Sequence, residues 1–154
     1  MKQVTIVDYG SGNVLSAQKS FVKVVTQNNL KFNILISNDI KDIKKSSHIV
    51  LPGQGAFATC MEGIKNKPGL IEELYEFAIT KKKPFLGICV GMQMLATDSQ
   101  ENGIHKGLGY IDGHIKNLPS KNNLKMPHMG WNIVKPLNYN KLITEKSDYY
   151  FVHS

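Results

Sequence analysis

Cys89 has the surroundings that a nucleophilic cysteine requires. It lies in residues 87–91, with the sequence GICVG, directly after a strand-like segment and before a helix-like one. This is the context of a nucleophile elbow, a sharp, strained turn whose flanking glycines avoid clashes with neighbouring elements. The helix N-terminus would favour the thiolate, and the N–H of Val90 would point to a developing oxyanion. A buried structural cysteine in a glycine-rich turn is the alternative interpretation.

A second glycine-rich loop, residues 51–57 with the sequence LPGQGAF, also follows a strand-like segment. Its glycines would allow a peptide to turn its N–H toward a neighbouring site, which predicts a second oxyanion donor. An ordinary turn between a strand and a helix is the alternative. Cys60 has no comparable surroundings, and we interpret it as structural.

The elements that must position these loops alternate between strands and helices. Strands are expected at 4–7, 32–36, 49–51 and 84–88, and helices at 13–25, 39–45, 70–78 and 91–95. This alternation predicts an α/β fold with right-handed βαβ units and a mostly parallel sheet that is covered on both faces. Ligands bind outside the carboxyl ends of such strands, where both glycine-rich loops lie.

The pattern changes after about Thr97, where glycines punctuate shorter strands. Strands are expected at 113–116, 131–134 and 149–152, and the polar stretch 116–125 predicts a hairpin loop or excursion. Because the last expected strand ends just before Ser154, no room remains for a covering helix. We therefore expect the fold to lack C-terminal strands and a helix.

Composition narrows the possible partners. The net charge is +7, but every basic residue is a lysine, and the longest lysine runs are residues 44–45 and 81–83. Specific nucleic-acid recognition relies on the planar fork of arginine, so we expect no nucleic-acid partner. We interpret the scattered lysines as a solvated surface, and binding to an acidic partner surface is the alternative. The two cysteines form no metal-binding pattern. We therefore expect no bound metal. The absence of a signal peptide and of a long apolar run predicts a cytoplasmic protein that does not bind to a membrane.

Six motifs in chain order resemble class I glutamine amidotransferases, and most closely the amidotransferase subunits of imidazole glycerol phosphate synthase. They are residues 8–13 (DYGSGN), 51–57 (LPGQGAF), 87–93 (GICVGMQ), 107–109 (GLG), 127–132 (PHMGWN) and 150–154 (YFVHS). The resemblance covers the whole chain. It implies a single amidotransferase domain over residues 1–154, with a flavodoxin-like three-layer sandwich and no cofactor.

The resemblance also implies a reaction. Cys89 would attack the side-chain amide of glutamine, ammonia would leave, and the thioester would be hydrolysed to glutamate. The ammonia would pass to a (β/α)8-barrel cyclase subunit, the heterodimer partner, which makes imidazole glycerol phosphate in histidine biosynthesis.

The site residues that the resemblance implies form three groups. Backbone groups of the oxyanion hole would come from Gly53, Gln54 and Val90. The residues that hold glutamine would be Gly55, Gln93, His153 and Ser154. The residues that face the barrel partner would be Asn13, Trp131 and Tyr150. Ordinary roles are the alternatives, with Trp131 as a core or surface aromatic and Gln93 as a solvated polar residue, and we interpret His128 as holding a loop.

One departure from the family pattern concerns the catalytic base. The family places a His, and two residues later a Glu, on a later strand, but none of the five histidines here is followed by x-Glu. Without that base the chain loses its proton relay, so we expect the chain as written to be a poor glutaminase. Gln54 also stands where the family often has an apolar residue, which matters little if only its backbone contributes.

Two alternatives to the histidine-pathway subunit remain open. A paralogue with the same chemistry could supply ammonia for a surface-sugar modification, and only the partner would distinguish it. A catalytically inactive partner-binding module is the non-enzyme alternative, and the missing His-x-Glu favours it.

Overall fold

A computed structural model describes residues 1–119, 125–138 and 141–154. The chain forms two compact units, Met1–Lys116 and Asn117–Ser154. The larger unit carries both glycine-rich loops, and the smaller one carries a β-hairpin. That the two units make a single domain stays a prediction.

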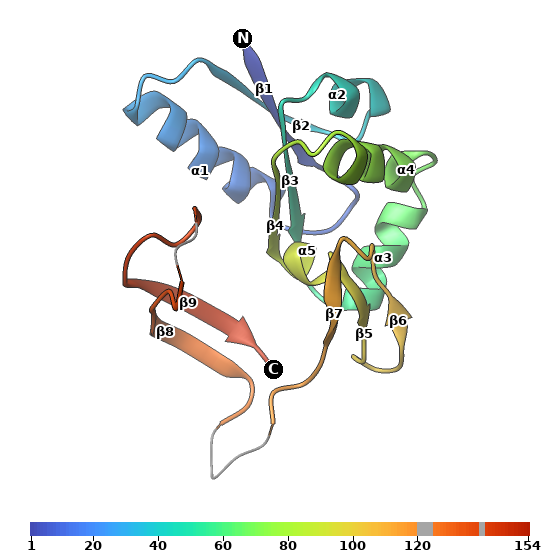
Figure 1. Cartoon of the computed structure of the whole chain (residues 1–154), viewed down its shortest axis with the longest axis vertical. Helices are drawn as coiled ribbons and strands as arrows, with labels where there is room; N and C mark the ends of the chain where they lie inside the picture. Colours follow the sequence, from blue (N-terminus) through green and yellow to red (C-terminus); the bar gives the residue numbers. More distant parts are fainter. Residues whose placement is uncertain (120–124, 139–140) are drawn as a thin grey trace. The chain divides into compact units, whose positions relative to one another are not determined.

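The larger unit is built on a four-stranded parallel sheet with the strand order β2-β1-β3-β4 (Figure 1). The strands are β1 (Lys2–Val7), β2 (Phe32–Ser37), β3 (His48–Gly53) and β4 (Phe85–Cys89). Helix α1 (Val14–Gln27) lies on one side of the sheet, and α2 (Ile40–Lys45), α3 (Phe57–Lys65) and α4 (Leu70–Tyr75) lie on the other. The predicted α/β fold with a mostly parallel central sheet is confirmed.

Alternating strand residues enter two separate cores. In β3, Ile49 and Leu51 face the helices α2 to α4, whereas Val50 faces the side of α1 and packs with Ile6. These side chains are at most 1% exposed, as expected for a parallel strand that is covered on both faces. Phe21 of α1 closes the second core. The sheet is therefore a rigid support for the loops at its carboxyl edge.

Polar caps set where two of these helices begin. The side chain of Asn13 accepts a hydrogen bond from the N–H of Ser16 at 3.0 Å, and that of Asp39 accepts from the N–H of Lys41 at 2.7 Å. Both contacts satisfy N–H groups that have no partner in the first helical turn. The predicted cap at Asn13 is thus confirmed. Helix α4 continues into a π-helical turn, η1 (Glu76–Thr80), which was expected as ordinary helix.

The helix expected over 91–95 is shorter than predicted. Helix α5 spans only Val90–Gln93, and the chain then enters β5 (Ala96–Ser99). The N–H groups of Leu108, Gly109 and Tyr110 bond the carbonyls of Met94, Ala96 and Leu95, respectively. In a longer helix these carbonyls would accept hydrogen bonds from later helical N–H groups. Their bonds to residues 108–110 take the place of that helical pattern, so the helix ends at Gln93.

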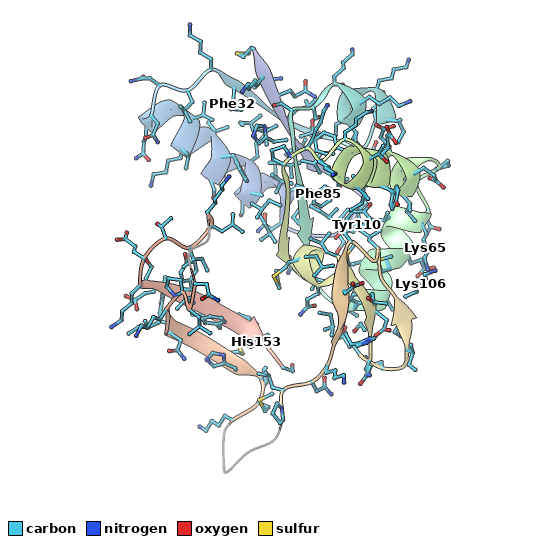
Figure 2. The ribbon with its side chains drawn as sticks, in the orientation of Figure 1. Phe32, Lys65, Phe85, Lys106, Tyr110 and His153 are labelled. Carbon is cyan, nitrogen blue, oxygen red and sulfur yellow. The ribbon has the colours of Figure 1, made fainter. Side chains whose placement is uncertain are left out.

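A small second sheet carries this segment. It has the order β6-β5-β7, with β6 (His105–Lys106) antiparallel and β7 (Ile111–Ile115) parallel to β5. Figure 2 shows Tyr110 beside Phe85 of β4, and their rings make a T-shaped contact with centroids 5.9 Å apart. This contact joins the second sheet to the strand that carries Cys89.

The smaller unit is an antiparallel hairpin of β8 (His128–Val134) and β9 (Ser147–His153). Both strands were expected, but each is longer than predicted because the pairing runs in register from His128↔His153 to Val134↔Ser147. Of the excursion expected over 116–125, residues 120–124 lie outside the described residues.

Candidate active site at the Cys89 elbow

Cys89 has the strained backbone that an elbow requires. Its φ is 55° and its ψ is −122°, at the junction between β4 and α5. A positive φ is uncommon for a residue with a Cβ and carries a conformational cost that the surrounding structure must support. The side chain is exposed. The predicted strand–turn–helix geometry is confirmed, although α5 is a single turn and its dipole is correspondingly short.

Glycines allow the elbow to pack directly on β3. A Cβ on Gly91 would overlap the carbonyl oxygen of Leu51, and a Cβ on Gly87 would meet the Cα of Met92 at 2.5 Å. No side chain fits at either position, because the nearest atoms belong to the backbone. The close contact between α5 and the end of β3 therefore depends on these glycines.

The oxyanion loop, residues 52–55, lies beside the elbow. Gly53 is the register partner of Cys89 in the β3–β4 pairing. A Cβ on Gly53 would meet the carbonyl carbon of Val90 at 2.8 Å, so the peptides of Gly53 and Val90 are in contact range. Two of the three residues predicted for the oxyanion hole, Gly53 and Val90, are thus brought together beside the predicted nucleophile Cys89. Gln54 and Gly55 follow on the exposed part of the same loop, with Gly55 at φ 91°.

A pocket of about 400 Å³ opens next to Cys89. Asn13, Gln54 and Cys89 all line it, so the structure places a predicted partner-facing residue beside the predicted nucleophile. Six further lining residues are not among the predicted site residues, namely Ser16, Ala17, Ser20, Phe21, Pro52 and Ile88. Those in α1 could have been expected in part, because the loop that leads from β1 into α1 lies at the same carboxyl edge of the sheet as the loop after β3.

The remaining predicted site residues lie elsewhere. Gln93 is half-buried on α5, close in the chain to Cys89. His153 and Ser154 belong to the hairpin unit, where Nε2 of His153 is 2.8 Å from Nδ1 of His128. His128 was expected to hold a loop, and the structure places it in β8, bonded across the strands. The convergence of His153 and Ser154 on Cys89 stays a prediction.

Trp131 and Tyr150 are a cross-strand pair in this hairpin. They are register partners, and their ring centroids are 5.6 Å apart in an edge contact. Their side chains are 74% and 56% exposed, respectively. Trp131 is thus an exposed residue of the hairpin unit, and its role at a partner-facing surface stays a prediction.

The histidines of the larger unit have partners away from the elbow. His48 contacts the hydroxyl of Ser47 at 2.9 Å, and His114 contacts the carboxylate of Asp98 at 2.9 Å. Burial, and to a smaller extent Lys2, lowers the pKa of His48 below its usual range. Nε2 of His105, the third histidine of this unit, lies 3.4 Å from the carbonyl oxygen of Asn102, so each of the three imidazoles has such a contact.

Among the described residues, no cluster of three or more His, Cys, Asp or Glu side chains has the arrangement of a metal site. Within the same ranges, no helix is both long and apolar enough to cross a membrane.

Comparison with known proteins decides the family. The model of the family described as glutamine amidotransferase class-I matches residues 5–154. The chain belongs to the class I glutamine amidotransferases. This amidotransferase chain is thus an enzyme subunit by family, and the resemblance seen in its six motifs is confirmed.

Three curated relatives of this amidotransferase are named as subunits of imidazole glycerol phosphate synthase, two of them as "Imidazole glycerol phosphate synthase subunit HisH". The protein from Pelagibacter ubique is 45% identical over 155 residues, covering 98% of this chain and 73% of the relative. The protein from Rhodospirillum rubrum is 43% identical over 131 residues, covering 84% of this chain and 61% of the relative. The "HisH 1" protein from Campylobacter jejuni (strain RM1221) is 40% identical, and 98% of this chain aligns with 73% of that relative.

Proposed function

We propose that this amidotransferase binds glutamine in the pocket beside Cys89 and hydrolyses it through a thioester on that residue. The observation that carries this proposal is the strained Cys89 elbow packed against the oxyanion loop. Strain at an exposed cysteine is retained only where the surroundings enforce it, which is typical of a residue that must present its sulfur. The glycines that enforce it here are Gly53, Gly87 and Gly91.

Each residue of the site has a chemical task in this proposal. The sulfur of Cys89 attacks the amide carbon of glutamine, forming a C–S bond while the carbonyl oxygen takes up negative charge. Backbone N–H groups of Gly53, Gln54 and Val90 stabilise that charge. Collapse of the intermediate breaks the C–N bond, and ammonia leaves once a proton reaches the nitrogen. Water then cleaves the thioester, and glutamate is released.

The binding part of this proposal can be tested without turnover. A glutamine-shaped chloroketone should alkylate Cys89 faster than iodoacetamide does, because the pocket holds the reagent beside the sulfur. Excess glutamine should slow this reaction at least about tenfold, whereas glutamate should not, since it carries a charged carboxylate in place of the amide. Peptide mapping by mass spectrometry would identify the labelled cysteine. Equal protection by both ligands would contradict a glutamine site.

We also propose that the hairpin binds the ammonia-accepting subunit. Cross-strand partners share one face of an antiparallel pair, and successive residues alternate between faces. Met129, Trp131 and Ile133 of β8 therefore share a face with Val152 and Tyr150 of β9. These five side chains are 53–74% exposed, which makes a continuous apolar surface. Large exposed apolar surfaces with aromatic residues are typical of protein interfaces.

Changing Trp131 to Ala should weaken binding to a cognate (β/α)8-barrel cyclase subunit by about 30-fold, because a central aromatic anchor contributes about 2 kcal/mol or more. Tyr149→Ala is the matched control, since this aromatic lies in the neighbouring strand position and on the opposite face. Its effect should be less than about threefold. Calorimetry or surface plasmon resonance would measure both. Equal effects of the two changes would contradict the assignment of this face.

The names of the relatives support a cyclase that makes imidazole glycerol phosphate as the partner. Asn13 lines the pocket beside Cys89, so a partner that covers this region would also receive ammonia as it leaves. A partner that covers the pocket would retain the ammonia, which would otherwise be protonated in solvent. A paralogue that serves surface-sugar modification would differ in its partner. This proposal includes a cytoplasmic location for the chain, as expected from the sequence.

A further inference from the structure

Two carbonyl groups of the oxyanion loop are held by side chains from the loop that follows β1. The carbonyl of Pro52 accepts a hydrogen bond from the hydroxyl of Tyr9 at 2.6 Å. The carbonyl of Gln54 accepts one from the hydroxyl of Ser11 at 2.8 Å. Tyr9 is only 2% exposed. Neither hydroxyl belongs to the reaction described above.

Cys60 of α3 also contacts both Ser11 and the carbonyl group of Gln54. Its sulfur lies 3.2 Å from the oxygen of Ser11 and 3.4 Å from the carbonyl oxygen of Gln54. Ser11 has one hydroxyl proton, and its short bond to Gln54 uses it. The thiol of Cys60 can then donate either to the oxygen of Ser11 or to the same carbonyl. Both arrangements hold Gln54 in the same orientation.

Tyr9 remains a hydrogen-bond donor at any working pH. Burial raises the pKa of its hydroxyl far above the ordinary value, and the nearby Cys60 raises it further. The hydroxyl therefore stays protonated and continues to donate to Pro52. A buried donor that lost its acceptor would carry a desolvation penalty of about 1–3 kcal/mol, so the contact also resists rearrangement of the loop.

Peptide planarity converts these contacts into control of the oxyanion donors. The carbonyl of Pro52 is in one plane with the N–H of Gly53, and that of Gln54 is in one plane with the N–H of Gly55. Fixing both carbonyls fixes both planes. The Gly53–Gln54 peptide lies between these two planes and carries the N–H of Gln54. Its rotation is restricted because the peptide on each side of it is held in place.

We propose that Tyr9, Ser11 and Cys60 are positioning residues that orient the Gly53–Gln54 peptide as an oxyanion donor, an inference that rests on the proposed glutaminase function. The far end of the loop is anchored as well. The N–H of Phe57, at the start of α3, donates to Oε2 of Glu101 at 2.8 Å, where the helix has no side-chain cap of its own. The loop is therefore held at Pro52 and Gln54, and the helix that follows it is held at Phe57.

The test compares two reactions of the same sulfur in the 154-residue chain. The γ-p-nitrophenyl ester of glutamate, which carries the ester in place of the amide of glutamine, acylates Cys89: a C–S bond forms, the C–O bond breaks, and p-nitrophenolate leaves with the electron pair. This leaving group needs no proton, so the reaction needs no general acid, but it passes through an oxyanion. Iodoacetamide alkylates the same sulfur by displacement of iodide, without an oxyanion. With the ester at saturating concentration, so that its binding to the pocket does not enter, the ratio of the acylation and alkylation rates reports on the oxyanion hole.

Ser11→Ala should lower the acylation rate about tenfold, and Ser11→Ala with Cys60→Ala about 30-fold, below the 10²–10³-fold cost of deleting a donor outright. Tyr9→Phe removes only a hydroxyl and should also lower acylation about tenfold. Cys60→Ser keeps a donor in place and should stay within about twofold. Alkylation should remain within about twofold in every variant, which also shows that the elbow is folded.

Ser47→Ala is the matched control. Its hydroxyl also donates to a distant backbone carbonyl, that of Gln3, at 2.8 Å, but from the opposite end of β3. Both rates should be unchanged in this variant. If the double variant and the control acylate equally fast, the positioning role is overturned. If the unchanged chain acylates no faster than a free small thiol of equal alkylation rate, the oxyanion hole itself is wrong, and with it the proposed function.

Discussion

A polypeptide of residues 1–154 is expected to react with alkylating reagents at Cys89 and yet to hydrolyse glutamine about 10²–10⁴-fold more slowly than a chain that also carries a His-x-Glu segment. The thiol is exposed on its elbow, so alkylation requires nothing further. Turnover requires a proton for departing ammonia and an activated water for the thioester. No His-x-Glu occurs within residues 1–154, and His48 and His114 are bonded elsewhere.

The comparison uses a chimaera in which the C-terminal segment of the Pelagibacter ubique relative follows Ser154. Glutamate release would be measured for both chains with and without a barrel cyclase. Cys60 is an internal control for alkylation, because it is fully buried and should stay unmodified while Cys89 reacts. Cys89→Ala should abolish both labelling and the activity of the chimaera. Glutamine hydrolysis by residues 1–154 at the rate of the chimaera would contradict the assigned need for a base.

Gly91→Ala is expected to lower the free energy of unfolding by about 3 kcal/mol, which corresponds to a fall in Tm of about 10 °C for a chain of this size. The added Cβ would overlap the carbonyl oxygen of Leu51, a backbone atom in the middle of the sheet. Either β3 or α5 must shift. Alanine favours a helix over glycine by about 1 kcal/mol at most, which is too little to offset the overlap. The alkylation rate of Cys89 should change as well, since the elbow moves with α5.

Gly109→Ala is the control for a general effect of replacing glycine. Gly109 has a φ of 69°, and a Cβ there would meet no atom within 4 Å. Its cost should be limited to backbone strain of about 1 kcal/mol, with the reactivity of Cys89 unchanged. Thermal unfolding by circular dichroism and the rate of alkylation would measure both variants. Equal Tm values for the two would contradict the packing assigned to Gly91.

The carboxyl-edge site could be predicted because it depends on local chemistry. Residues 87–91 carry the strand, the cysteine and the glycines in one short stretch, so the elbow at Cys89 follows from sequence. The end of α5 could not be predicted in the same way. The carbonyls of Met94 to Ala96, directly after α5, accept from the N–H groups of Leu108 to Tyr110, about fifteen residues further on. Periodicity carries no information about such partners.

The sequence by itself determined which loops meet, since parallel strands place their carboxyl ends at one edge and Gly53 and Cys89 each end such a strand. Only the tertiary structure decided what holds those loops. Cys60 is isolated in the sequence and has no motif, yet the packing of α3 brings its sulfur to Ser11 and Gln54. The physical reason is the difference in range. Strand ends and elbow geometry are encoded in neighbouring residues, whereas a hydrogen bond across more than forty residues exists only once the sheet has folded.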